Sequence, residues 1–271
     1  MKIPDVLQLS PLQNNVLVCL AMMIYFKSAI EFACWMRFRW KLPVSRHVLQ
    51  MSLSSLVFFW PYFVKDDWSW KLNTVVPFSL LIRLLYKGAL VRDPNDLDVQ
   101  NMSVSSSPND LLFGPVLMAG MMIWLGVYQF MEVEAAIMAA VACGDSIAPL
   151  IGRRWGRHIF QMPLGRSKTM EGSVVGVFLG TVAGSYVYLY AMGVPLLPLR
   201  AILAYAGIAA VTEATAPGNL DNLVTPVVLH FSMDYAKSYL LDDHEAEIVY
   251  SNSTDLIAES MLLQSLKWMA P

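Results

Sequence analysis

Charged residues are scarce in this sequence: Asp, Glu, Lys and Arg make up 15% of its 271 residues, whereas 56% are hydrophobic. An ordinary soluble domain has about a quarter of its residues charged, so this composition excludes that class. The net charge of −2 gives no basic surface, and we expect no nucleic-acid partner. We interpret the chain as a protein integral to the lipid bilayer.

Cysteine is also scarce, and the signatures of soluble nucleotide enzymes are absent. Cys19, Cys34 and Cys143 have no paired spacing, which excludes a disulfide scaffold and a cysteine metal site. The segment 165–169 has Ser167 where a phosphate-binding P-loop needs glycine, and no protein-kinase catalytic loop is present. The first dozen residues hold no cleavage-like site, so we expect no removable leader.

Long apolar runs are what the sequence does contain. Runs of about 18–22 residues can cross a bilayer, and they predict an all-α, multi-pass transmembrane bundle of seven or eight helices. We expect a membrane domain over 1–240, a polar loop over 93–109, and a polar tail over 241–271 with a short amphipathic helix at 255–268. The expected spans are 15–35, 47–64, 72–91, 111–130, 133–151, 172–192, 196–215 and 223–239.

Two of these helices carry residues that predict close packing. Lys27 and Glu31 lie one turn apart, and in lipid they would face a partner helix or each other. Glycines recur every fourth residue from 172 to 184, which predicts a smooth face for another helix.

Lys and Arg gather on one side of the expected membrane topology. Short loops rich in these residues remain cytosolic, or in the equivalent compartment of an organelle. We therefore expect the basic side to be cytosolic or stromal. The expected membrane is that of the endoplasmic reticulum or a plastid. The segments 37–46, 92–110, 152–171 and 216–222 should all emerge on that side, where they would form one polar site.

Asp145 follows Gly144 near the end of an apolar helix. A carboxylate at that depth must be paired, protonated or bound to a metal, because an isolated buried charge costs several kcal/mol. Ion pairing with Arg153 or Arg154 would be a purely structural explanation.

The basic segment 152–169 combines cations with flexible glycines. Arg153 and Arg154 can make bidentate contacts with phosphate, Lys168 supplies a point charge, and Gly152 lets backbone amides approach an anion. The helix that begins after Thr169 also favours an anion at its N-terminus. The alternative is a loop whose charges only set membrane orientation.

Glu213, Asp221 and Asn222 lie near the ends of two consecutive apolar runs. Brought together with Asp145, their oxygens would suit Mg²⁺, which usually keeps waters and substrate phosphates in its shell. Helix capping would account for Asp221 alone.

The order of these motifs along the chain resembles that of the membrane polyprenol kinase family. This family comprises phytol and farnesol kinases and, more distantly, dolichol kinase and CTP-dependent diacylglycerol kinase. The resemblance spans about 45–240, with its motif region over 109–240. Where phytol kinases often have a second Asp and an early His, this chain has Pro149 and Gln50. The matching motifs are 109–115, Gly144-Asp145, Gly152-Arg153-Arg154-Trp155-Gly156, Lys168-Thr169-Met170-Glu171-Gly172-Ser173, Glu213 and Asp221-Asn222 with Pro226.

The resemblance implies transfer of the γ-phosphate of CTP, or ATP, to a long-chain isoprenoid alcohol such as phytol, farnesol or geranylgeraniol. Asp145, Lys168 and Asp221 are then the expected catalytic residues, and Asp145, Asp221 and Glu213 the expected Mg²⁺ ligands. Expected nucleotide contacts are Gly152, Arg153, Arg154, Lys168, Thr169 and Asn222.

Other activities remain open at this point. A dolichol or diacylglycerol acceptor, or CTP-dependent cytidylyl transfer to a lipid phosphate, would use similar groups. A small-solute transporter with Asp145 and Glu213 as coupling residues is the alternative outside enzymes. The absence of an inverted repeat disfavours it.

Overall fold

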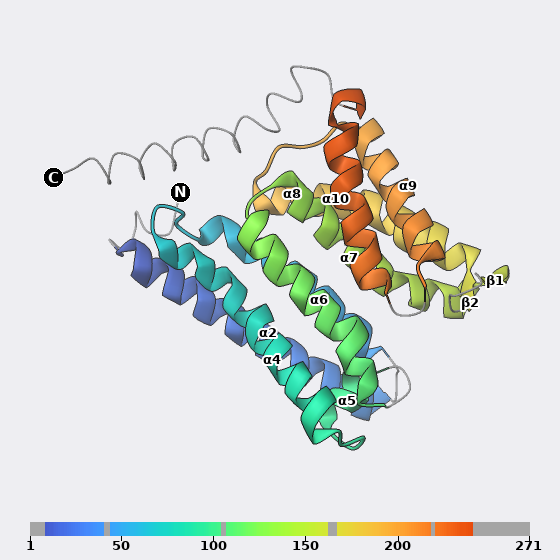
Figure 1. The fold of residues 1–271 in the computed structure, drawn as a ribbon, viewed down its shortest axis with the longest axis horizontal. Coiled ribbons are helices and arrows are strands. Elements are labelled where there is room, and N and C mark those ends of the chain that lie inside the picture. Colours follow the sequence, from blue (N-terminus) through green and yellow to red (C-terminus); the bar gives the residue numbers. More distant parts are fainter. Residues whose placement is uncertain (1–8, 41–43, 104–106, 162–166, 218–219, 241–271) are drawn as a thin grey trace.

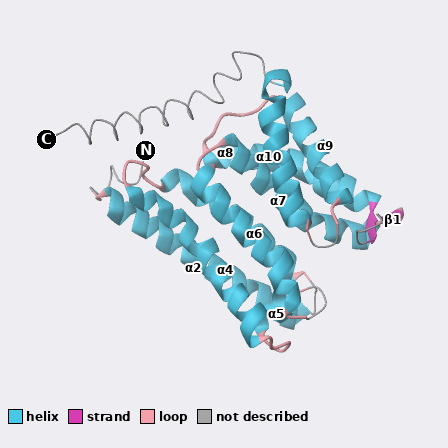
Figure 2. Ribbon diagram, in the orientation of Figure 1, coloured by secondary structure: helices cyan, strands magenta, loops and turns pink. Residues whose placement is uncertain are grey.

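The structure, a computed structural model, describes residues 9–40, 44–103, 107–161, 167–217 and 220–240. Helices dominate this part of the chain, with one pair of short strands (Figures 1 and 2). The expected all-α bundle is therefore confirmed as a class, although its basic segment holds a hairpin that the sequence did not predict. The expected tail helix at 255–268 lies outside the described residues.

The elements follow one another along the chain with short connections. Those marked η are 3₁₀ helices (η1 and η2) or π-helical segments (η3 and η4). In chain order they are α2 (Pro11–Trp40), α3 (Ser45–Ser54), η1 (Ser55–Tyr62), η2 (Trp68–Thr74), α4 (Val75–Leu85), η3 (Tyr86–Val91), α5 (Leu97–Met102), α6 (Asn109–Tyr128), α7 (Val133–Trp155), β1 (Ile159–Gln161), β2 (Ser167–Thr169), η4 (Gly172–Leu179), α8 (Gly180–Met192), α9 (Leu199–Thr215) and α10 (Asp221–Leu240).

Five helical segments of the described chain are long and apolar enough to cross a membrane. They are Pro11–Arg39, Trp68–Val91, Asn109–Tyr128, Val133–Trp155 and Gly172–Met192. The expected count of seven or eight is not confirmed. The run 47–64 is divided between α3 and the 3₁₀ helix η1, which contains Pro61, and α9 has only 17 residues.

α7 lies at the centre of the packing, between α3 on one side and η4 with α8 on another. Its buried face is rich in alanine, and a Cβ built on Gly180 would lie 3.2 Å from the Cα of Gly144 in α7. The two helices can approach this closely because neither has a side chain at that point. The close packing predicted from the glycine period is confirmed.

The polar loop expected over 93–109 is wrong in part, because α5 forms a short helix within it. Asp98 in α5 pairs with Arg83 at 2.6 Å and with Lys87 at 2.7 Å, and Asp96 pairs with Lys87 at 2.8 Å. These ion pairs fasten α5 to the end of the α4–η3 segment, and they help to place α5 beside α3.

Candidate active site

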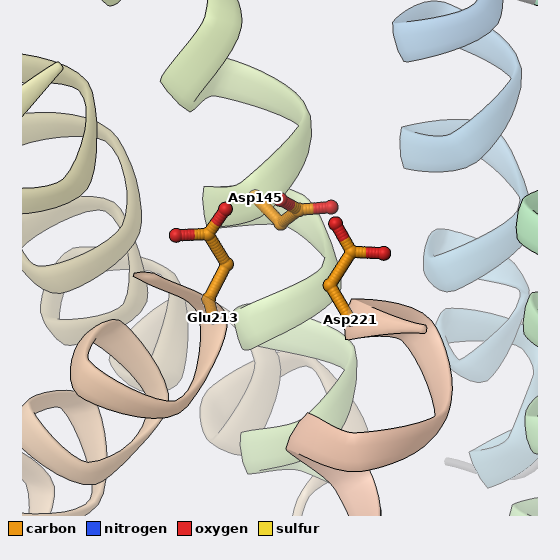
Figure 3. Close-up of side chains that lie close together, drawn as sticks. All are labelled: Asp145, Glu213 and Asp221. Atoms are coloured by element: carbon orange, nitrogen blue, oxygen red, sulfur yellow. The ribbon is translucent and has the colours of Figure 1, made fainter. Parts of the chain in front are cut away.

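Three carboxylates converge where α7, α9 and α10 meet. Asp145 comes from α7, Glu213 from the last turn of α9 and Asp221 from the start of α10 (Figure 3). Each offers an oxygen atom, and these three atoms lie within 4.8 Å of one another. The grouping predicted from three separate segments is therefore present.

A chain reversal between α9 and α10 brings Glu213 and Asp221 together. α9 ends at Thr215, Pro217 follows, and the Leu220 amide donates to the Pro217 carbonyl at 3.1 Å. α10 then runs back beside α9, as Figure 1 shows. The last turn of one helix and the first turn of the next are consequently held against the same side of α7.

Lys168 joins this cluster from the strand β2. Its Nζ lies 2.5 Å from Glu213 Oε1 and also donates to the Glu213 backbone carbonyl. Both side chains are largely buried, and Glu213 Oε2 has no hydrogen-bond partner among the described residues. One carboxylate oxygen is thus neutralised while the other retains its capacity to bind a cation.

Several contacts at its base hold the hairpin that carries Lys168. His158 Nδ1 lies 2.8 Å from Glu171 Oε1, and Thr169 Oγ1 accepts the Gly172 amide at 3.1 Å. Hydrogen bonds from its own backbone amide and from His158 hold the pKa of Glu171 down to about 2. The Glu171 carboxylate therefore stays ionised and bonded at any physiological pH.

Gln50 of α3 is hydrogen-bonded to Asp145. Its Nε2 donates to Asp145 Oδ2 at 2.8 Å. Within the described residues Asp145 makes no ion pair with Arg153 or Arg154, so the structural explanation offered by the sequence is not supported. Asp221 Oδ1 accepts the Asn222 amide at 3.0 Å, which leaves its second oxygen for another contact.

A cavity of about 510 Å³ opens beside the carboxylates. Its cationic lining comes from Arg37, Arg46, Arg153 and Lys168, which belong to α2, α3, α7 and β2. Gln100, Asn101 and Ser103 complete another wall. Described residues of the segments 37–46, 92–110, 152–171 and 216–222 therefore line one polar cavity, as the loop charges predict.

The remaining site residues predicted from the sequence fall into two groups. Gly152, Arg153 and Thr169 line the cavity with Lys168. Arg154 is exposed with its guanidinium 5.7 Å from the ring centre of Trp155, and Asn222 lines two smaller cavities instead. Neither Arg154 nor Asn222 is among the described residues that line the main cavity.

Sequence reasoning missed a group of lining residues on α2, α3 and α5. Gln50 stands where the family motif has His, and that departure is itself a signal that the position matters. In the sequence, Arg37 and Arg46 look no different from charges that only set membrane topology. Asn101 and Ser103 gave no signal in the sequence, since they lie in a polar segment that was expected to be a loop.

The donor set fits a hard divalent cation. Mg²⁺ prefers oxygen ligands and needs only one or two carboxylates when phosphates and water complete its shell. Three converging carboxylates, one with an unpartnered buried oxygen, provide that set. The adjacent cations would compensate the charge of the phosphates.

Comparison with known proteins assigns the chain to a family. A family model described as the cytidylyltransferase family matches residues 5–218, and the chain belongs to this family. The curated relatives it matches are phytol kinases, so the predicted resemblance is confirmed. No solved structure matches the chain.

The relatives match over limited regions. "Probable phytol kinase 2, chloroplastic" of Oryza sativa subsp. japonica is 30% identical over 127 residues, covering 46% of this chain and 41% of that protein. "Phytol kinase" of Synechocystis sp. is 33% identical over 115 residues, covering 41% and 46%. "Probable phytol kinase 1, chloroplastic" of Glycine max is 28% identical over 143 residues, covering 50% and 46%. The chain thus spans less than half the length of each.

Proposed function

We propose that this protein is a membrane lipid kinase that transfers the γ-phosphate of CTP or ATP to a long-chain isoprenoid alcohol of the phytol type. The observation that carries the proposal is the convergence of Asp145, Glu213, Asp221 and Lys168 beside one cationic cavity. The named activity of the phytol kinase relatives supports the alcohol as acceptor.

Each group in the cavity has a role in phosphoryl transfer. Asp145 and Asp221 would hold Mg²⁺, with Glu213 completing or orienting the shell, and the ion would neutralise charge on the donor phosphates. Lys168 and Arg153 would contact the triphosphate, and Arg46, on the facing wall, would do the same. Such positioning and charge neutralisation account for most of the catalysis of phosphoryl transfer.

The reaction itself requires one bond to form and one to break. The alcohol oxygen attacks the γ-phosphorus, the bond from that phosphorus to the bridging oxygen breaks, and the nucleoside diphosphate leaves. A carboxylate of the cluster orients the hydroxyl and accepts its proton. The acceptor's tail stays among the membrane helices, because each methylene moved into water would cost roughly 0.8 kcal/mol.

We further propose that the cavity faces the cytosol or stroma in an endoplasmic reticulum or plastid membrane, where nucleotides are present. The basic residues of its lining support this orientation.

Labelled nucleotides test the proposal. Purified protein in lipid vesicles is incubated with Mg²⁺ and CTP or ATP labelled at either the α- or the γ-phosphate, together with phytol, farnesol, geranylgeraniol, dolichol or diacylglycerol. We expect γ-label, and no α-label, in a phosphorylated isoprenoid alcohol. Absence of label from every lipid would reject the kinase.

The family description favours one second candidate, transfer of a cytidylyl group from CTP to a lipid phosphate. This reaction would place α-label in a CDP-lipid and release pyrophosphate. Adding a lipid phosphate acceptor to the same assay therefore separates the two reactions by the position of the label.

A further inference from the structure

One of the two smaller cavities lined by Asn222 is a narrow cleft among α6, α7 and α10, which we call the α6–α10 cleft. Asp145, Glu213 and Asp221, drawn in Figure 3, line both this cleft and the cationic cavity. Beyond them the lining is mostly apolar and includes Met121, Met138, Val141, Ala142 and Leu229. The other small cavity is lined by none of the three carboxylates. Of the two, only the α6–α10 cleft reaches the candidate metal site.

Along α7, Asp145 separates the lining of the cavity from that of the cleft. The cationic cavity is lined by residues that follow Asp145, up to Arg153, and the cleft by residues that precede it, back to Met138. Met138 lies seven residues before Asp145, so the apolar lining extends about 11 Å along the helix. Both α6 and α7 are candidate membrane spans. The cleft therefore leads from the carboxylates toward hydrocarbon, away from the basic residues.

Thr225 places a hydroxyl without a partner in this cleft. The residue is 4% exposed, and its Oγ1 has no hydrogen-bond partner among the described residues. The buried hydroxyls of Ser146 and Ser185, in contrast, donate to the carbonyl four residues earlier in their helices. Thr225 lies one helical turn after Asp221, on the same face of α10. Its hydroxyl is therefore available to a polar group that enters the cleft beside the carboxylates.

The geometry of phosphoryl transfer requires an approach from the side of the cleft. The attacking and leaving oxygens lie roughly in line across the phosphorus, so a nucleotide in the cationic cavity leaves the opposite side for the acceptor. The cleft has about 20 Å³ of free volume, which is room for about one water-sized group such as a hydroxyl. Met121 and Met138 have flexible side chains that can move aside for a hydrocarbon chain.

Resting on the kinase activity proposed above, we propose that the α6–α10 cleft binds the acceptor and that Thr225 bonds the acceptor hydroxyl. The chain that follows the hydroxyl lies between α6 and α10 and leaves past Met121 and Pro226, which are only partly buried. Diacylglycerol carries its hydroxyl beside two ester-linked chains, and a cleft this narrow does not admit both. The acceptor is therefore an alcohol with a single chain.

Removal of the Thr225 hydroxyl without a change of shape tests the contact. We expect Thr225→Val to lower kcat/KM for phytol about tenfold, as loss of one hydrogen bond does, and to leave the KM for the nucleotide unchanged. Thr225→Ser keeps the hydroxyl and should retain most of the wild-type value. Because the hydroxyl has no partner in the fold, Thr225→Val should also unfold at no lower temperature than the wild type.

Thr181 on α8 provides a matched control. It is fully buried, its Oγ1 also has no partner among the described residues, and it lines neither the cationic cavity nor the cleft. Thr181→Val makes the same change of hydroxyl to methyl and should leave the kinetics with phytol unchanged. Wild-type kinetics in Thr225→Val, or an equal loss in Thr181→Val, overturns the proposal.

Photo-cross-linking locates the acceptor without relying on turnover. Farnesol with a diazirine in its chain is irradiated with the wild-type protein in lipid vesicles, and the labelled peptides are mapped by mass spectrometry. We expect label around Met121 and Leu229 that excess phytol removes and excess diacylglycerol does not. Label confined to helices outside α6, α7 and α10, or equal competition by both lipids, overturns the proposal. Label in the cleft without phosphorylation of any lipid would reject the kinase and still support the alcohol site.

Discussion

At the scale of single residues, Lys168 is the side chain on which the site depends most. It pairs with Glu213 at 2.5 Å and lines the cavity where a triphosphate would bind. Burial of an ion pair is costly unless further contacts satisfy it. The Glu213 carboxylate beside Lys168 keeps one oxygen without a partner among the described residues. Lys168 is therefore better suited to binding a ligand than to stabilising the fold.

We predict that Lys168→Met lowers transfer to the alcohol by about 10²-fold or more, as loss of one group that stabilises transition-state charge does. Initial rates of label transfer, at matched amounts of protein in the membrane, measure the effect. Lys71→Met removes an exposed cation on η2 and should retain full activity. Equal rates for Lys168→Met and the wild type would contradict the role.

How far the sequence predicts the site differs from residue to residue. Asp145, Glu213, Asp221 and Lys168 could be found because charge in an apolar chain is costly, so each one signals a partner. Arg154 could not be told from Arg153 by chemistry, since both are exposed and only the helical phase of α7 places Arg153 in the lining of the cavity. Asn101 could not be found, because neutral polar residues in a polar segment carry no comparable signal.

At the scale of elements, the contact of α7 with η4 and α8 positions Asp145 relative to the hairpin. A Cβ on Gly176 would overlap the backbone and side chain of Ala148 in α7, whereas one on Gly207 meets nothing within 4 Å. The glycine face therefore determines how closely the two elements approach.

We predict that Gly176→Ala destabilises the protein by about 1–3 kcal/mol, the usual cost of overpacking. Gly207→Ala, the same change at an open helical position, should have no measurable cost. Thermal midpoints in detergent compare the two variants. Equal midpoints would mean that the helices do not pack as closely as described.

The contact between Glu171 and His158 predicts how the stability of the β1–β2 hairpin depends on pH. The pKa of Glu171 lies at about 2, below its ordinary value of 4.5. Because the pKa of Glu171 is lower in the folded protein, its ionised carboxylate stabilises the fold fully at pH values above 4.5. This stabilisation is lost as the pH falls through about 2. Between pH 8 and pH 5 the Glu171 carboxylate should therefore stay ionised, and its contribution should not be lost.

We predict that Glu171→Gln speeds hydrogen exchange of the β1–β2 amides at pH 5 by at least as large a factor as at pH 8, because protonation of the His158 imidazole would only strengthen its pair with the carboxylate. Mass spectrometry of peptic fragments measures it. Asp93→Asn, an exposed carboxylate elsewhere, should leave hairpin exchange unchanged. A difference that disappears already at pH 5 would contradict the lowered pKa.

Sequence patterns predict long helices better than interrupted ones. The bounds of the 172–192 segment agree with the structure because glycine and apolar residues continue without a break. The run 47–64 is also long enough to cross a membrane, yet it changes to a 3₁₀ helix at Ser55. Length and hydropathy alone do not register such a change, because they carry no information on backbone hydrogen bonding.

At the scale of the whole molecule, the bundle gathers polar groups from distant segments around one cavity. Ile159 lies in β1 and is exposed, so it reports on which side the hairpin lies. In a protein whose native cysteines are replaced by serine, Ile159→Cys should react with a membrane-impermeant maleimide from the cytosolic or stromal side of sealed vesicles. Reaction only from the other side would reverse the proposed orientation.

The central claim is that Asp145 and Asp221 act as one unit to hold a metal-bound donor. The most direct measurement compares γ-phosphate transfer to phytol by Asp145→Asn, Asp221→Asn and the double variant at equal protein. Because groups that act together are not additive, each single variant should lose about as much activity as the double variant. Substantial activity in both single variants, or losses that multiply in the double variant, would contradict the account.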